Sequence, residues 1–229
     1  MDTALWPSER CSSHFYSGPQ EERNSEAPDI NASSSPLSVF LLYFEEIITL
    51  LVVETNRYYH DHLDRLDQGP SPQPDVTEAK MRVFLALTIS MGHCIWDKLT
   101  DYWSRATSFH TTFYGNAMSR DRFLHILRFL HFTDNTNGPD MKDENSDRLR
   151  KIRNAFDILK DKFSKFYSPS KHLAADELIV KFKGRVIFRQ YIPKKHKRFG
   201  IKIYKVCDET GYKYEMTIWA ETVSALLNI

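Results

Sequence analysis

The chain has 229 residues, of which 41% are hydrophobic and 13% aromatic, and its 31 Lys and Arg nearly balance its 30 Asp and Glu. This composition is sufficient for a packed core in one domain or two small ones, and it excludes a chain that is disordered throughout. The three cysteines contain no close pair, which excludes a disulfide framework and a zinc-ligand spacing and is typical of a reducing compartment.

The first 35 residues are rich in Ser, Pro, Glu and Asn and poor in aliphatic side chains. Such a segment cannot bury enough apolar surface to offset the entropy of ordering, so we expect a disordered tail over 1–35. The apolar run at 36–53 contains Glu45 and Glu46, which makes it a poor membrane span. With no secretory signal pattern at the start, we expect a soluble protein without a membrane partner.

The next part of the chain has apolar residues at intervals of three and four, which predicts helices. The expected helices span 37–59, 79–91, 120–131 and 147–167, with a short one at 96–104. Asp75 followed by Glu78 predicts a capping box for the second of these, and Ser119 is the expected N-cap of the helix that follows it. The acidic, turn-rich segment 133–146 predicts a loop without a ligand.

After 168–170 the apolar spacing changes to two, which predicts strands. We expect three antiparallel strands over 173–182, 201–207 and 212–219. The turn between the last two gives Asp208 a turn role in preference to a metal-ligand role. The predicted fold class is therefore α+β, with a helical region at 36–167 and a partial sheet at 168–220.

Basic residues are concentrated in the segment from Lys181 to Lys205, which contains ten of them and no Asp or Glu. Interleaved with aromatic rings, these cations predict a surface that binds the DNA backbone. The alternative is a basic loop that balances the acidic helices. The candidate phosphate-contacting residues are Lys181, Lys183, Arg185, Arg189, Lys194, Lys195, Lys197, Arg198 and Lys202.

Several motifs resemble those of piggyBac-type DNA transposases and the proteins derived from them. The longest is D-E-x-x-V-x-F-K-G-R-x-x-F-R-Q-Y-I-P-K-K, which starts at Asp176 and is followed by F-G-I-K at 199–202 and V-C-D at 206–208. Upstream, M-S-R-D-R-F at 118–123, I-L-R-F-L-H-F at 126–132 and D-R-L-x-K-I-R at 147–153 resemble the same family. The resemblance covers roughly 36–219.

The resemblance implies an RNase H-like catalytic core in which three aspartates bind divalent metal, and it matches Asp176 to the first of them. In-line attack on a phosphodiester with two metal ions needs several carboxylates, so Asp176 alone supplies at most one Mg²⁺ ligand of an incomplete site. The alternative role for Asp176 is structural, capping a turn or pairing with a lysine. In this fold the outer edge of the first strand is expected to be unpaired here or covered by helices.

The residues at 221–229 match nothing in the family, and we expect a truncated copy or an alternative ending of a longer product. Together these features predict a nuclear, transposase-derived DNA-binding protein that is catalytically incomplete. Self-association, or association with a related transposase, is the expected protein partnership. The alternative is an active transposase or nuclease whose missing carboxylates come from another chain or a longer product.

Overall fold

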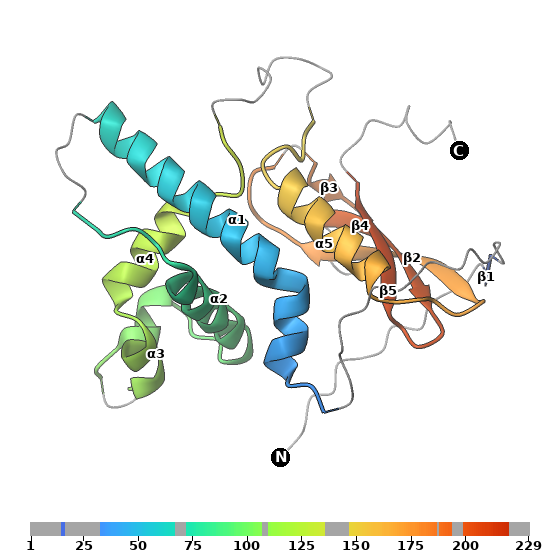
Figure 1. The fold of residues 1–229 in the computed structure, drawn as a ribbon, viewed down its shortest axis with the longest axis horizontal. Coiled ribbons are helices and arrows are strands. Elements are labelled where there is room, and N and C mark those ends of the chain that lie inside the picture. The colour runs from blue at the N-terminus through green and yellow to red at the C-terminus, as the bar shows by residue number, and fades with distance from the viewer. Residues whose placement is uncertain are drawn as a thin grey trace. The chain divides into compact units, whose positions relative to one another are not determined.

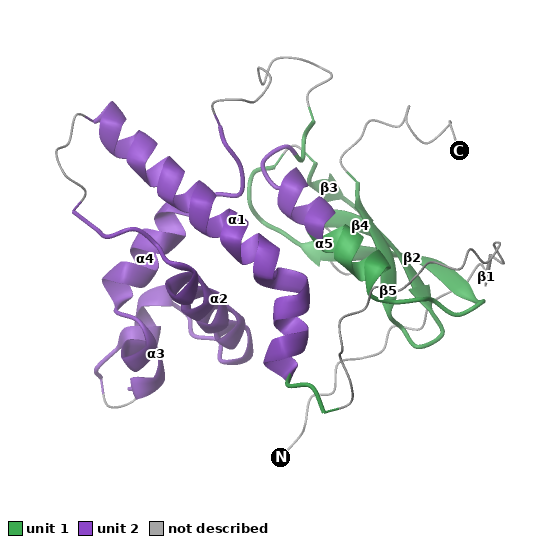
Figure 2. Ribbon diagram, viewed as in Figure 1, with its two compact units in different colours: residues 1–35, 147–149, 159–229 green, residues 36–146, 150–158 purple. Residues whose placement is uncertain are grey.

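The computed structural model describes residues 15–16, 33–66, 72–106, 110–135, 147–186, 188–193 and 199–219. The chain forms two compact units (Figure 2). One is helical and comprises 36–146 and 150–158; the other contains the sheet and comprises 1–35, 147–149 and 159–229. A helical part thus precedes an antiparallel sheet, which confirms the predicted α+β class, while the domain boundaries proposed from the sequence remain predictions.

The helical unit is built around its first and longest helix, which packs on the second and fourth helices (Figure 1). Its elements are α1 (Pro36–Arg65), α2 (Glu78–His93), the 3₁₀ helix η1 (Leu99–Trp103), α3 (Thr112–Ala117) and α4 (Arg120–Phe129). The ring of Phe84 on α2 lies 4.8 Å from that of Phe123 on α4, and both side chains are fully buried. Apolar stripes read from the sequence therefore do form the core of this unit.

The first helix also has the length and apolar composition of a membrane span. In the structure Ile48 and Leu51 are buried within the helical unit, and α1 carries the charged side chain of Glu54 among its buried residues. Only 17% of the most apolar 18-residue window of α1 is buried, although core helices pass the same test of length and composition. The absence of a membrane partner stays a prediction.

Two helix N-caps were expected, and the structure places one of them differently. Ser119 caps α4 as predicted, accepting a hydrogen bond from the backbone N–H three residues on. The cap of α2 is Thr77, whose hydroxyl accepts the N–H of Lys80 at 3.4 Å. Asp75 instead lies 2.8 Å from Nε2 of His60 on α1. The predicted capping box is therefore wrong: the N-cap is Thr77, two residues after Asp75, and its hydroxyl accepts the kind of backbone N–H that a capping carboxylate would accept.

The fifth helix begins later than its apolar periodicity suggested, because turns precede it. α5 spans Arg153–Lys165, whereas the prediction started at 147. The Asp147 carboxylate accepts the backbone N–H of Leu149 at 2.9 Å and holds a turn there, which buries the Leu149 side chain. A local side-chain hydrogen bond of this kind competes with helix formation.

The sheet has β2 (Leu173–Lys181) and β4 (Phe199–Asp208) as its long antiparallel pair, and β5 (Lys213–Ile218) follows β4 through a hairpin. These are the three predicted strands, each within two residues of its expected ends. The short β3 (Gln190–Tyr191) pairs with the start of β4. The turn into β5 uses Gly211, whose φ of +83° lies in the left-handed region that glycine adopts without strain.

The outer edge of β2 is partly paired, which differs from the sequence expectation. β1 (Phe15–Tyr16) pairs antiparallel with Ala174 and Leu173 at the start of β2. Backbone groups from the N-terminal segment thus satisfy part of an edge that was expected to be unpaired or helix-covered. Most of the segment predicted as a disordered tail lies outside the described residues.

Within the sheet unit, the last turns of α5 pack against β5 and the turn that precedes it (Figure 1). The Phe163 ring lies 5.9 Å from that of Tyr212, and the Tyr212 hydroxyl donates to the Phe163 carbonyl oxygen at 3.1 Å. Lys160 Nζ lies 3.1 Å from Oε1 of Glu215 on β5. The helix therefore fixes the position of the β4–β5 hairpin.

Candidate nucleic-acid interface and carboxylate site

The two acidic residues of the D-E motif lie in the middle of β2 and point to opposite faces of the sheet, because side chains alternate along a strand. Asp176 stands opposite Lys205 on β4, whose Nζ lies 3.2 Å from the Asp176 Oδ2 atom. On the other face, Lys202 Nζ lies 2.7 Å from Oε2 of Glu177. Each carboxylate therefore has a lysine partner on β4, and the lysine-pairing role left open for Asp176 is the one observed.

Lys202 also contacts aromatic rings on its face of the sheet. Its Nζ lies 4.7 Å from the ring centre of Tyr204 and 5.9 Å from that of Trp219. Burial disfavours the ammonium, but hydrogen bonds with Glu177 and Tyr204 outweigh it and raise the pKa of Lys202. The cation is thus held charged and directed at a carboxylate and two rings.

The described residues do not fit a divalent metal. Among them, no three His, Cys, Asp or Glu side chains are gathered as a metal site would require. The Asp176 carboxylate faces an ammonium group, whereas Mg²⁺ requires several oxygen ligands in near-octahedral geometry. No chemical step can be built on a metal at this position from these residues.

Asp208 has the turn role expected from the sequence. It is 6% exposed, and its carboxylate accepts the Thr210 hydroxyl at 2.6 Å and the backbone N–H groups of Thr210 and Tyr212 at 3.0 and 3.2 Å. The Tyr167 hydroxyl also donates to it. Burial favours the neutral acid, but the hydrogen bonds prevail and lower the pKa of Asp208, while the bond to Asp208 raises the pKa of Tyr167. Its oxygens are committed to the hairpin turn and to Tyr167.

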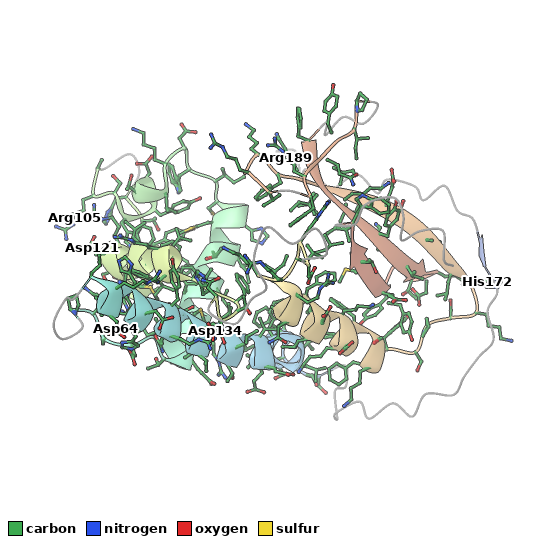
Figure 3. All side chains as sticks on the ribbon, turned by 90° about the horizontal axis from the view of Figure 1, so that it is seen from above. Asp64, Arg105, Asp121, Asp134, His172 and Arg189 are labelled. Atoms are coloured by element: carbon green, nitrogen blue, oxygen red, sulfur yellow. The ribbon has the colours of Figure 1, made fainter. Side chains whose placement is uncertain are left out.

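The predicted phosphate-contacting residues divide into groups once they are placed on the fold. Four of them are exposed: Lys181 is the last residue of β2, and Lys183, Arg185 and Arg189 lie in the connection from β2 to β4. Figure 3 shows Arg189 at the end of the sheet opposite to His172. Lys202 is paired with Glu177, and its predicted contact with DNA stays a prediction. The remaining four, Lys194, Lys195, Lys197 and Arg198, lie outside the described residues.

Arg189 has a fixed place in this connection. Its Nη1 atom donates to the carbonyl oxygens of Lys183 and Gly184 at 3.1 and 3.2 Å. The guanidinium carbon lies 5.4 Å from the ring centre of Phe199, the first residue of β4. Arg189 therefore ties the turn after β2 to the start of β4 while remaining exposed.

Sequence reasoning counted Lys205 as one more cation and missed its contact with Asp176. The observed pair follows from the β2–β4 register, in which each residue of one strand has a defined opposite on the other. The sequence shows only that Lys205 lies on a predicted strand near the D-E strand. Which residue of the D-E strand it faces depends on the register, and the register is seen only in the folded sheet.

Comparison with known proteins agrees with the motifs. The family described as transposase IS4 matches residues 35–224. The chain belongs to this family. Its relatives are of the piggyBac type: PiggyBac transposable element-derived protein 3 of Homo sapiens is 27% identical over 179 residues, which is 78% of this chain and 28% of the relative. PiggyBac transposable element-derived protein 2 of Homo sapiens is 27% identical over 188 residues, or 82% of this chain and 29% of the relative.

A solved structure supports the same assignment of the fold. The cryo-EM structure of a piggyBac transposase synaptic complex with hairpin DNA matches with a TM-score of 0.70 and 28% identity, over 82% of this chain and 40% of that chain. The helical part and the antiparallel sheet thus correspond to part of a transposase with an RNase H-like core. The chain spans less than a third of the curated relatives and 40% of the solved one.

Proposed function

We propose that this chain is a DNA-binding protein derived from a piggyBac-type transposase, and that it does not cleave DNA by itself. The observation that carries the DNA-binding part is the group of four exposed cations, Lys181, Lys183, Arg185 and Arg189, at one end of the sheet. Exposed lysine and arginine side chains bind the phosphate backbone favourably, because binding releases the counterions that are condensed on DNA. The solved relative, determined with hairpin DNA, is consistent with this proposal.

The proposed lack of cleavage rests on the surroundings of Asp176. Phosphodiester chemistry with two metal ions needs a carboxylate available to bridge or bind them. Here the Lys205 ammonium lies 3.2 Å from the Asp176 carboxylate and already supplies the positive charge that a metal would supply. We therefore propose that Mg²⁺ is not a resident cofactor of this chain, although the family usually uses a divalent metal.

The remaining parts of the proposal concern partners and location. The solved relative is a synaptic complex, which favours self-association of this chain or association with a related transposase. DNA as the partner implies the nucleus as the place of action. Size-exclusion chromatography with light scattering, with and without duplex DNA, tests the first point, and imaging of a tagged chain tests the second.

A salt titration of affinity for duplex DNA, followed by fluorescence anisotropy, tests DNA binding. Each neutralised phosphate contributes about −0.9 to the log–log slope on duplex DNA, so four contacts predict a slope of about −3 to −4. Combined Lys181→Gln, Lys183→Gln and Arg185→Gln changes should flatten that slope by about 2 to 3. The matched control removes three exposed cations of the helical unit, Lys80, Lys98 and Arg105, and should leave the slope unchanged. Equal slopes for the two triple variants would refute the assignment.

A nicking assay with Mg²⁺ tests the lack of cleavage. We expect no product from the wild-type chain beyond that of buffer. Product that depends on Mg²⁺ and disappears in Asp176→Asn would contradict the proposal and favour the alternative of an active nuclease.

A further inference from the structure

Two aromatic side chains next to the exposed cations remain largely open to solvent. Tyr191 on β3 and Phe199 on β4 are 56% and 47% exposed. They stand directly opposite each other in the antiparallel pair, with ring centres 4.7 Å apart and planes inclined by 36°. Rings exposed singly are ordinary, whereas a paired and exposed set on a basic connection presents a continuous apolar face.

This face is rigid on its inner side. The Phe199 ring contacts the Arg189 guanidinium, which is itself held by the carbonyl oxygens of Lys183 and Gly184. The β3–β4 backbone pairing fixes the spacing of the two rings. A ring pair held in this way loses little freedom when a flat ligand stacks on it, which favours binding.

The charge around the ring pair selects the kind of ligand. Lys183, Arg185 and Arg189 are exposed in the connection that contains Tyr191, and the sequence from 181 to 205 contains no acidic residue. Flat apolar faces combined with concentrated cations match unpaired nucleobases carried on a phosphate backbone. In duplex DNA the bases stack on one another, so their faces are not accessible without unstacking.

We propose that Tyr191 and Phe199 form a stacking platform for unpaired bases of single-stranded DNA, while the neighbouring cations bind its phosphates. The proposal rests on the DNA-binding function proposed above and deepens it by naming the DNA form. Charge alone would bind any form of DNA through its phosphates. With the platform, affinity depends also on the unpaired bases of a single strand.

The test compares three fluorescein-labelled ligands at one salt concentration: an oligothymidylate of about 20 nucleotides, longer than most single-strand binding sites, an abasic strand of the same length, and a duplex. The variants are Tyr191→Leu and Phe199→Leu, which keep apolar bulk but remove the ring. Tyr191→Phe retains the ring, and Phe113→Leu is the matched control, since Phe113 is 56% exposed in the helical unit.

We expect wild type to bind oligothymidylate more tightly than the abasic strand. Each leucine variant should weaken oligothymidylate binding by about fivefold or more, the range for loss of a stacked base, and change abasic and duplex binding less than twofold. Tyr191→Phe and Phe113→Leu should bind as wild type. Circular dichroism establishes that each variant is folded.

Unchanged oligothymidylate affinity in folded leucine variants would overturn the stacking platform and leave the proposed function standing. So would an equal loss on all three ligands, which shows that the rings only support the basic connection. Failure of wild type to bind any of the three ligands refutes the proposed function itself. If a leucine variant does not fold, photocrosslinking of the wild-type chain to 5-iodouracil DNA decides: crosslinks at Tyr191 or Phe199 support the platform, and crosslinks confined elsewhere overturn it.

Discussion

The close approach of the β2 backbone to Gly200 makes Gly200→Ala a sharp test of the β2–β4 pairing. Gly200 is buried in β4, opposite Lys181 of β2. A Cβ atom added there would lie 2.3 Å from the Val180 carbonyl oxygen, 3.0 Å from the Val180 carbonyl carbon and 2.8 Å from Cγ2 of Ile179. Carbon–oxygen contacts between strands normally measure about 3.3–3.6 Å, so the strands must separate by about 1 Å.

The free-energy cost of separating the strands depends on which atoms contact the added methyl group. Overpacking typically costs about 1–3 kcal/mol, and a backbone neighbour relaxes less easily than a side chain. Widening the ladder also weakens interstrand hydrogen bonds, each worth about 0.5–1.5 kcal/mol net. We therefore expect Gly200→Ala to lower the free energy of unfolding of the sheet unit by about 3 kcal/mol.

Urea denaturation measures the loss of stability, and hydrogen exchange shows whether the loss occurs in the sheet unit. With a slope of about 2 kcal/mol per molar urea, a loss of about 3 kcal/mol lowers the midpoint by about 1.5 M. Amides of β2 and β4 should lose protection while those of α2 keep theirs. Gly92→Ala is the control, because nothing lies within 4 Å of its added Cβ and an alanine should stabilise α2 by up to about 1 kcal/mol. A Gly200→Ala chain as stable as wild type would refute the close approach of the two strands.

Three further predictions concern single contacts. The folded-state pKa of Asp208 is lowered, so the Asp208 carboxylate stabilises the sheet at pH values above its unfolded pKa of about 3.9. This contribution is lost as pH falls through the lower folded value. Thermal unfolding measured against pH should show the loss of stability in acid for wild type and a flatter profile for Asp208→Asn. Asn56→Ala removes both hydrogen bonds that its amide makes with the backbone of Val76, at 2.8 and 2.9 Å, and should cost about 2–3 kcal/mol in urea denaturation. A double-mutant cycle of Asp176→Asn and Lys205→Met should give a coupling free energy of about 1 kcal/mol, since both groups are partly exposed; additive effects would show that the pair does not interact.

The strands were predictable because two local signals agreed. The apolar alternation of β2, and the turn residues between β4 and β5, fix where strands begin and end without reference to the rest of the fold. Helix ends were less predictable because they depend on local side-chain hydrogen bonds. Thr77 rather than Asp75 caps α2, and Asp147 holds a turn where a helix was predicted. The six-residue α3 was not predicted at all, because it is too short to show a periodic pattern.

The environment of Asp176 was not predictable from the sequence, although its place on a strand was. A short turn would have set the register between the paired strands, but the β2–β4 connection extends from 182 to 198 and leaves the register open. A shift by one residue would place the Lys205 side chain on the other face of the sheet. The partner of this carboxylate is therefore a property of the folded sheet.

The basic segment contains cations that pair with the D-E carboxylates and cations that are exposed, and the strand geometry separates these two groups. Lys202 and Lys205 differ by an odd number of positions, so alternation sends them to opposite faces, where each meets one carboxylate of the D-E motif. Their charges are matched inside the sheet. The exposed cations instead lie at the end of β2 and in its connection to β4, together with the Tyr191 and Phe199 rings. Changes in the connection should therefore alter affinity for DNA without disturbing the Asp176 pair, and changes at Lys205 should alter the sheet without changing the salt dependence of DNA binding.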